Sequence, residues 1–443
     1  MALNLRARIR YFREHRFVQN FAILQFGNLG NIVQAIVGIF LVRLLKPEAY
    51  GLYALAFSLA GLMTVVLGLG AQDAVTTIVS ETYARKDKDA TREALSFLAW
   101  STVILGLISI AGSFLAPWLA GHWYHNSTVG FYASIIIIAS VISTLFYSFA
   151  AISLQVVGRY KALTALGLAD QLTRTGLSLL FVFLGFGVLG AVAGHFVGAL
   201  LVFFISLGLW EGIKTRHEIF PSIRGLFAGG RKLPIKKYFG FSFWIAVDRN
   251  IANLYNILPV SILGLYVVAT QITYFKLAFG YINLALSFLG PISTILAVEF
   301  PKIKVEESGR LARNFVKVSL YSCAVSLVIT AAAILVSPIA FHILYGKAVT
   351  QSVPLVAGLF VYGALYGIGV GLGPMWRAIN QVRISILINT VTLGIGIPLG
   401  LYLIKHHGAW GAVIMVTLWY SCSHVYSFFY LTRKLKRLEV SHA

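Results

Sequence analysis

Charged residues are scarce in this chain, and acidic residues are the scarcest of them. Asp, Glu, Lys and Arg together make up 12% of the 443 residues, and only 15 are acidic, whereas soluble domains carry about 25% charged residues. Because 58% of the residues are apolar and the mean hydropathy is +0.82, the chain cannot build a water-soluble shell. A soluble enzyme and a disordered chain are both excluded, which leaves a polytopic membrane protein.

Cysteine is also nearly absent, and a cleavable signal peptide is not expected. Cys323 and Cys422 lie in apolar runs without metal-type spacing, so they are interpreted as packing residues that do not report the redox compartment. The first 18 residues are basic and lack a short apolar core with a small-residue cleavage site. The net charge of +21 comes from Lys and Arg placed between apolar blocks, which is typical of cytoplasmic loops and argues against a nucleic-acid partner.

The apolar blocks predict an all-α protein with twelve transmembrane helices. A helix needs about 20 mainly apolar residues to cross a bilayer. If the N-terminus is cytoplasmic, 28 of the 36 Lys and Arg residues fall in inner segments and 4 in outer loops, which predicts that both termini are cytoplasmic. The predicted spans are 19–43, 51–79, 94–117, 130–157, 162–184, 187–210, 239–262, 265–298, 314–337, 353–376, 384–404 and 410–431.

The spans divide into two lobes of six helices, 19–210 and 239–431. A basic cytoplasmic loop, 211–238, joins them, and a cytoplasmic tail, 432–443, follows the last span. Leu5, Ile9 and Phe12 recur at helical spacing in the basic arm 1–18. This arm is either an amphipathic helix on an anionic membrane surface or a solvated segment that only sets topology.

Short motifs repeat in the same order in both lobes, which predicts a parallel internal repeat and pseudo-two-fold symmetry along the membrane normal. The repeat also predicts a central cavity between the lobes, as in transporters. The matching motifs are Gly51-Leu52-Tyr53-x-x-Ala56 with Gly264-Leu265-Tyr266-x-x-Ala269, Arg92-x-Ala94-x-x-Phe97 with Arg310-x-Ala312-x-x-Phe315, and Gly187-x-x-Gly190-Ala191 with Gly408-x-x-Gly411-Ala412.

Two kinds of polar residue inside the spans are candidates for binding a large, anionic, hydrated ligand. Intramembrane cations bind phosphate by paired donors, and amides bind sugar hydroxyls. In the alternative interpretation, the Asp residues only neutralise nearby cations, and the amides only join neighbouring helices. The candidate cations are Arg174, Arg249 and Lys276; the candidate amides are Asn28, Asn31, Gln34, Asn250, Asn253 and Asn256; the acids that are candidates for ion coupling are Asp73, Asp170 and Asp248.

The segment 44–53, Leu-Leu-Lys-Pro-Glu-Ala-Tyr-Gly-Leu-Tyr, resembles the L-x-P-x-x-[YF]-G-x-[YF] signature of bacterial polysaccharide flippases. The turns 68–70 and 155–160 and the start of the sixth span at Gly187 agree with this family. With its layout of six plus six spans, the chain resembles the Wzx or polysaccharide transport family. That family belongs to the multidrug/oligosaccharidyl-lipid/polysaccharide (MOP) superfamily. Family members often carry Arg late in the second span, where this chain has Asp73, so that role is not transferred.

The resemblance implies a V-shaped, MATE-like pair of lobes in the bacterial inner membrane. It implies a flippase that moves an undecaprenyl-pyrophosphate-linked oligosaccharide, such as an O-antigen, capsule or exopolysaccharide unit, from the cytoplasmic to the periplasmic leaflet. Membrane lipids, a polysaccharide polymerase and a priming glycosyltransferase are the expected partners. We expect no cofactor, whereas coupling to a proton or sodium gradient stays open.

Two other functions remain as alternatives. A cation-coupled drug exporter of the same fold would need an acidic, aromatic cavity, whereas basic groups at mid-membrane are at least as numerous as acids here. A polyprenyl-dependent glycosyltransferase would need a catalytic acid or a metal-binding acidic pair. The chain has no D-x-D motif, and the loop 211–238 contains only Glu211 and Glu218 as acids. The sequence therefore favours a transporter that is not an enzyme.

Overall fold

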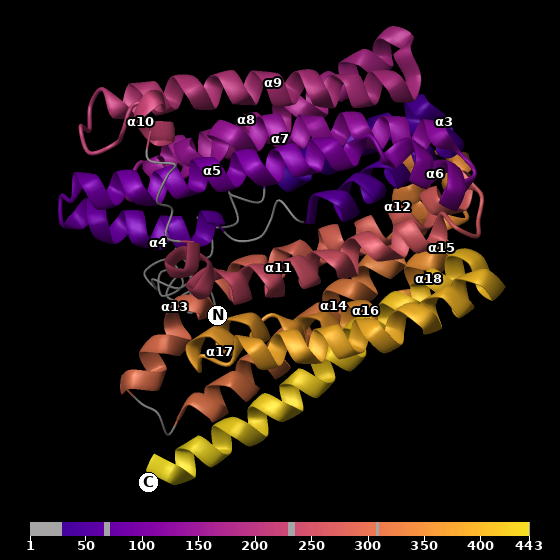
Figure 1. Ribbon diagram of the computed structural model, residues 1–443. Helices are drawn as coiled ribbons and strands as arrows, with labels where there is room; N and C mark the ends of the chain where they lie inside the picture. The colour runs from indigo at the N-terminus through magenta and orange to yellow at the C-terminus, as the bar shows by residue number, and fades with distance from the viewer. Residues whose placement is uncertain (1–28, 66–70, 229–234, 307–309, 443) are drawn as a thin grey trace, which may run out of the picture. The chain divides into compact units, whose positions relative to one another are not determined.

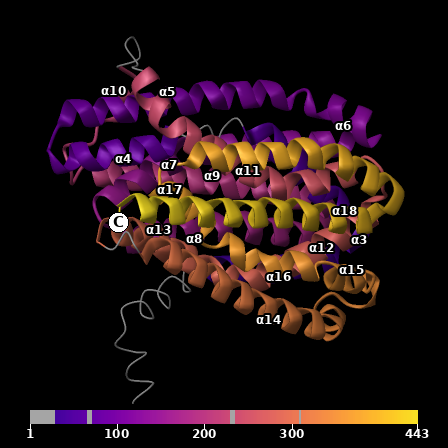
Figure 2. The same ribbon diagram turned by 90° about the horizontal axis from the view of Figure 1, so that it is seen from below.

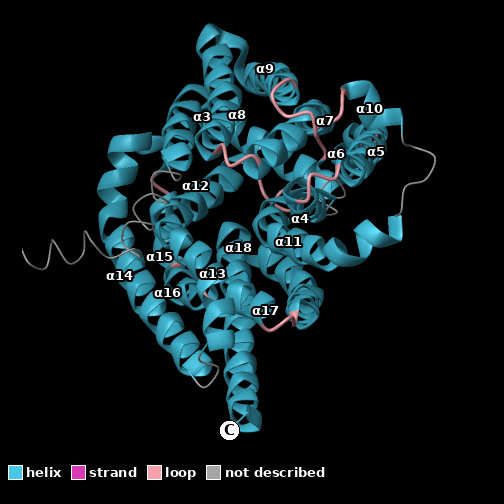
Figure 3. Cartoon of the chain, turned by 90° about the vertical axis from the view of Figure 1, so that its left-hand side faces the viewer, coloured by secondary structure: helices cyan, strands magenta, loops and turns pink. Residues whose placement is uncertain are grey.

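The computed structural model describes residues 29–65, 71–228, 235–306 and 310–442. Within these ranges every regular element is a helix, and short loops join the helices (Figure 3). The predicted all-α class is therefore confirmed. The basic arm 1–18 lies outside the described residues, so its predicted amphipathic helix stays a prediction.

Six helical stretches in the described ranges are long and apolar enough to cross a membrane, or seven if one bent pair counts as a single span. Two of them, Tyr160–Lys214 and Val382–Arg437, contain 55 and 56 residues. At 1.5 Å per residue each is about 80 Å long, enough to cross a bilayer core twice. Gly185 and Gly187 break the first stretch, and Gly408 breaks the second, each with a positive φ. These breaks fall between the predicted spans 5 and 6 and between 11 and 12.

The described residues form two compact units, one within residues 36–273 and one made of residues 29–35 with 274–442. The helix α11 (Ile235–Leu263), which we predict as the first span of the second lobe, belongs to the former unit and packs there against α4 (Ala71–Ala84). A unit defined by contacts need not follow a sequence repeat, and the predicted lobes stay a prediction.

In the unit 36–273, α5, α7, α8 and α9 run side by side (Figure 1). Glycines allow the backbones of α8 and α9 to approach closely: a Cβ on Gly198 would lie 2.5 Å from the Cα of Arg174. This packing places Arg174 at a junction of helices. Besides α4 and α11, the helices of this part of the chain are α3 (Leu29–Thr64), α5 (Lys88–Ser113), α6 (Ala116–Tyr124), α7 (Ser127–Val156), α8 (Tyr160–Phe181), a π-helical turn (Val182–Phe186), α9 (Gly187–Lys214) and α10 (Ile223–Ala228).

The third predicted span ends earlier than expected. The helix α5 ends at Ser113, and a separate short helix, α6, begins at Ala116 with Pro117 in its first turn. Proline lacks a backbone N–H donor and is therefore tolerated in a first turn but not in a helix interior. The predicted boundary at residue 117 is wrong by about one helical turn.

In the unit that contains residues 274–443, α14 packs against α16, and α16 packs against α18 (Figure 2). The predicted tenth span is broken, with a bend of 49° between residues 352–358 and 360–378. A 3₁₀ turn over residues 287–289 interrupts the predicted eighth span. The elements are α12 (Ala269–Leu286), α13 (Gly290–Glu306), α14 (Leu311–Tyr345), α15 (Ser352–Gly358), α16 (Phe360–Gly369), α17 (Leu372–Ala378), α18 (Val382–His442) and a 3₁₀ turn (Lys347–Val349).

Candidate functional site

Side chains from three helices hold Arg174. Its Nε donates to Oδ1 of Asp170 at 2.6 Å on α8, which is the predicted i,i+4 ion pair. Its Nη2 donates to Oγ of Ser143 on α7 at 2.6 Å, and its Nη1 lies 3.3 Å from Nε2 of His195 on α9. Because a guanidinium only donates, Nε2 of His195 accepts and the imidazole carries its proton on Nδ1. Arg174 therefore joins α7, α8 and α9.

This ion pair is largely enclosed. The side chains of Arg174 and Asp170 are 16% and 27% exposed, and the ring of Phe57 packs edge-on against His195 with centroids 5.0 Å apart. A charge inside a membrane costs at least about 2.5–3.5 kcal/mol, so each partner reduces the cost of the other. The intrahelical pair is confirmed. All three nitrogens of the Arg174 guanidinium already have partners within the protein. A role of Arg174 in binding pyrophosphate stays a prediction.

Arg249, Asn253 and Asn256 lie on one exposed face of α11. Their spacing of i, i+4 and i+7 places them together on a helix, and all three are exposed. Asn250 points elsewhere: it is 7% exposed, and its Nδ2 has no hydrogen-bond partner among the described residues. Asp248 is half-buried. The predicted amide stripe of α11 is therefore split, with two amides beside Arg249 and one inside.

The structure describes the remaining predicted residues only in part. Lys276 on α12 is half-buried and makes no hydrogen bond or ion pair among the residues that the structure describes. Gln34 on α3 is exposed. Asn28 and the side chains of Asn31 and Asp73 lie outside the described part of the chain. A single cavity lined by all of these residues stays a prediction.

The two copies of the repeated motif that begins Gly-Leu-Tyr contact each other. Gly51, the first residue of the first copy, lies against the backbone of Ala269, the last residue of the second copy, and a Cβ on residue 51 would overlap that carbonyl. In return, a Cβ on Gly264 would lie 2.5 Å from Cδ1 of Leu55. All four residues belong to the unit 36–273. The repeat that the sequence reveals is therefore also a packing contact, which we call the motif contact.

Hydroxyl groups extend the motif contact along both sides. Oγ of Ser58 and Oγ of Ser261 lie 2.7 Å apart, and both side chains are buried. Oγ1 of Thr273 donates to the carbonyl of Pro47 at 2.5 Å, next to Lys46, where φ is 64°. These three hydroxyl residues were not among the residues predicted from the sequence. Small polar residues often join membrane helices, yet spacing alone does not show which of them pair.

A second polar cluster, which was not predicted from the sequence either, lies in the unit that contains residues 274–443. The hydroxyl of Tyr362 on α16 donates to Oδ1 of Asn283 on α12 at 2.5 Å, and its ring packs edge-on against Tyr420 of α18 with centroids 4.9 Å apart. Oγ of Ser423 on α18 donates to Oδ1 of Asn389 on the same helix. Because Tyr362 is 1% exposed, we interpret this cluster as a junction of helices.

The first part of the predicted interlobe loop packs against α5. Nζ of Lys88 lies 2.9 Å from Oε2 of Glu218, and Nε of Arg92 donates to the carbonyl of Gly225 at 3.2 Å. The hydrogen bond from Lys88, reinforced by its positive charge, lowers the pKa of Glu218 below its ordinary value. Residues 215–228 therefore pack against α5, although the sequence predicts only a basic connecting loop.

Solved structures of MOP-superfamily proteins share this fold. An inward-facing multidrug resistance MATE transporter matches with a TM-score of 0.77 at 14% identity, covering 94% of this chain and 96% of the transporter. The lipid II flippase MurJ, in an inward closed conformation, matches with a TM-score of 0.67 at 15% identity, covering 94% and 90%. An outward-facing MATE transporter gives a TM-score of 0.65 at 15% identity, covering 96% of both chains. These likenesses confirm the predicted MATE-like fold.

At the level of sequence, no curated protein matches the chain. The family described as polysaccharide biosynthesis protein, however, matches residues 17–303, nearly two thirds of the chain. This match covers the signature at 44–53 and the motif contact. The chain is therefore a multi-pass membrane protein that belongs to the polysaccharide biosynthesis protein family.

Proposed function

We propose that the chain is a flippase that moves an undecaprenyl-pyrophosphate-linked oligosaccharide from the cytoplasmic to the periplasmic leaflet by alternating access. The observation that carries this proposal is the match to a polysaccharide biosynthesis family in a chain with the fold of transporters. In this proposal the chain lies in the bacterial inner membrane with both termini in the cytoplasm. It moves its cargo without making or breaking covalent bonds, and it is not an enzyme.

The exposed face of α11 supports an anionic, glycosylated cargo. A guanidinium such as that of Arg249 binds phosphate oxygens through paired N–H donors. The amides of Asn253 and Asn256 offer both donors and acceptors, as sugar hydroxyls require. All three side chains are exposed. Arg249 is therefore our first choice for contact with the pyrophosphate, and the half-buried Lys276 is the second.

Coupling and partners are further parts of the proposal. Asp73, Asp170 and Asp248 are the candidates for coupling to a proton or sodium gradient; without coupling, flipping follows the concentration gradient of the cargo. Because Asp170 already pairs with Arg174, its protonation would leave that cation unpaired. A polysaccharide polymerase and a priming glycosyltransferase are the proposed protein partners.

Transport in liposomes tests the function directly. A fluorescent polyprenyl-pyrophosphate oligosaccharide is followed with a membrane-impermeant quencher, and a cationic dye is followed in parallel. We expect the parent protein to flip the glycolipid, and Arg249→Gln to slow flipping roughly tenfold or more, since hydrogen bonds to charged groups contribute about 1.5–3 kcal/mol. Lys317→Gln removes another exposed cation, on α14, and is expected to flip at the parental rate.

The two cargoes separate the proposed function from its main rival. Dye movement without glycolipid movement would contradict the flippase and favour a drug exporter. If Arg249→Gln and Lys317→Gln both flip the glycolipid as fast as the parent, the function would be supported and the role of Arg249 overturned. Circular dichroism and monodisperse elution show that each variant is folded before it is compared.

A further inference from the structure

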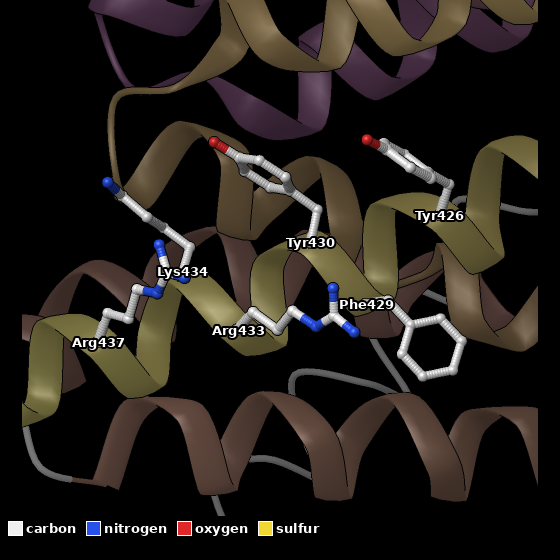
Figure 4. A pocket seen from close by; sticks show the side chains of 6 residues that line it. All are labelled: Tyr426, Phe429, Tyr430, Arg433, Lys434 and Arg437. Atoms are coloured by element: carbon white, nitrogen blue, oxygen red, sulfur yellow. The ribbon is translucent and has the colours of Figure 1, made fainter.

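A groove of about 300 Å³ runs along the last two turns of the final transmembrane helix and the tail that follows (Figure 4). Its described lining comes from one face of α18, with residues spaced at i, i+3, i+4, i+7, i+8 and i+11. Three are aromatic and the next three are basic. We call them the aromatic–basic stripe: Tyr426, Phe429, Tyr430, Arg433, Lys434 and Arg437.

Packing on the other side of α18 fixes the direction of this stripe. Leu431 and Leu435 are 0% and 1% exposed, so the helix cannot rotate without exposing both. The ring of Tyr430 also packs against Trp376 of α17, with centroids 5.6 Å apart. In contrast, Tyr426 and Phe429 are 61% and 57% exposed. The stripe is therefore a built surface with a fixed orientation.

The order of residues along the stripe follows the order of groups in a phospholipid. The aromatic half continues the apolar span, and the basic half begins where the predicted cytoplasmic tail begins. The eleven steps from Tyr426 to Arg437 rise about 16 Å, a length that joins the acyl region to the headgroup. Among the residues that the structure describes, Arg433, Lys434 and Arg437 are not paired with a carboxylate. Their charge is available to an anion.

We propose that the aromatic–basic stripe binds the phosphate headgroup of an anionic phospholipid from the cytoplasmic leaflet. The cations contact the phosphate through charge-assisted hydrogen bonds, and the aromatic rings pack against the glycerol and the upper acyl chain. Basic pockets at the cytoplasmic ends of membrane helices are suited to this chemistry. This site is independent of the proposed flippase function.

The size of the groove favours a phospholipid over the glycan cargo. Ligand pockets span about 300–1,000 Å³, so this groove is at the small end, where one headgroup fits and an oligosaccharide does not. Basic residues that only set topology need no particular register around the helix. Here all three cations fall on the same face as three aromatic rings (Figure 4), a register that a lipid site requires.

Two lysines on α18 give a matched test. Lys434 lines the groove, whereas Lys436 does not, and the two side chains point about 200° apart around the helix. Each is replaced by Gln in the full chain, and binding of phosphatidylglycerol is measured by native mass spectrometry from detergent, with phosphatidylcholine as reference. We expect Lys434→Gln to weaken binding of phosphatidylglycerol roughly fivefold and R433Q/K434Q/R437Q to weaken it about 100-fold, since each cation near the membrane contributes about 1 kcal/mol.

Controls distinguish this site from a general effect of charge. Lys436→Gln and the triple variant R85Q/R216Q/R224Q, which removes three exposed cations from other segments, are expected to bind as the parent does. Equal losses in these controls would overturn the proposal, as would equal binding of phosphatidylcholine. Binding of undecaprenyl pyrophosphate in place of phosphatidylglycerol would also overturn it, and would assign the groove to the cargo.

Discussion

Gly51 of α3 lies against the backbone carbonyl of Ala269 at the start of α12, so closely that no side chain fits between them. The two residues occupy opposite ends of the two copies of one repeated motif. The predicted pseudo-two-fold axis would bring equivalent segments together, and the second contact, between Gly264 and Leu55, is expected from it. The motif contact is thus a seam at which the two copies of the motif touch, and the proposed alternating access would require this seam to open.

Replacing Gly51 by Ala tests the closeness of this seam. The added methyl group would overlap a backbone atom, which cannot rotate away, so we expect a loss of about 1–3 kcal/mol in stability. Gly38 on the same helix is the control, because a Cβ there meets nothing within 4 Å. Thermal unfolding in detergent should show a lower midpoint for Gly51→Ala and an unchanged or higher one for Gly38→Ala. Similar midpoints for both variants would show that the seam is not closed in solution.

A disulfide across the seam should stop transport. Oγ of Ser58 and Oγ of Ser261 are 2.7 Å apart, so cysteines at both positions place their sulfurs close to the bonding distance of about 2.05 Å. In a background where Cys323 and Cys422 are Ser, we expect oxidation of S58C/S261C to reduce flipping to the level of empty liposomes. Dithiothreitol should restore it, because the bond alone prevents the seam from opening.

The control pair for this experiment is T82C/T91C. Oγ1 of Thr82 and Oγ1 of Thr91 are 2.8 Å apart across the connection between α4 and α5. This disulfide should form equally well and leave flipping unchanged, since it joins neighbouring segments of one hairpin. If S58C/S261C forms its disulfide and still flips glycolipid at the parental rate, the seam stays closed throughout transport.

The positions of the helices could be predicted because a membrane imposes a strict length and apolarity on each span. The predicted span 130–157 and α7, Ser127–Val156, differ by at most three residues. Interruptions inside spans were not predictable. The bend between α15 and α16 at Leu359 follows Pro354 and Gly358, but both residue types are also common inside continuous membrane helices, so the sequence alone did not mark it.

The candidate site was only partly predictable, for a related reason. The pair of Asp170 and Arg174 follows from helical spacing alone, so the sequence was sufficient. Ser143 and His195 lie on two other helices, and only the packing of α7, α8 and α9 brings them to Arg174. The amide stripe of α11 shows the opposite problem. Their spacing predicts that Asn250 and Asn253 share one helix face. In the structure the buried face of α11 includes Asn250 and leaves Asn253 exposed.

The ion pair between Lys88 and Glu218 should make the packing of the loop on α5 depend on pH. The pKa of Glu218 is lowered in the folded protein, so the stabilisation is fully present above the ordinary pKa of 4.5 and is lost as the pH falls through the lowered value. We expect Glu218→Gln to lower the unfolding midpoint slightly at pH 7 and not at all once Glu218 is protonated. Both side chains are mostly exposed, so high salt should remove the difference. A difference that persists in acid or in high salt would contradict this assignment.

Neutralising Asp170 and Arg174 together separates a structural role from a role in binding cargo. Arg174→Gln alone leaves an enclosed carboxylate without its partner and should cost about 2–4 kcal/mol in stability. The double variant D170N/R174Q carries no charge, so we expect most of that stability to return, with a coupling energy of about 1–3 kcal/mol between the two sites. Because the guanidinium of Arg174 already donates hydrogen bonds to Ser143 and His195, we also expect the double variant to flip glycolipid at close to the parental rate. A double variant that is as stable as the parent and does not flip would instead assign the guanidinium of Arg174 to the pyrophosphate.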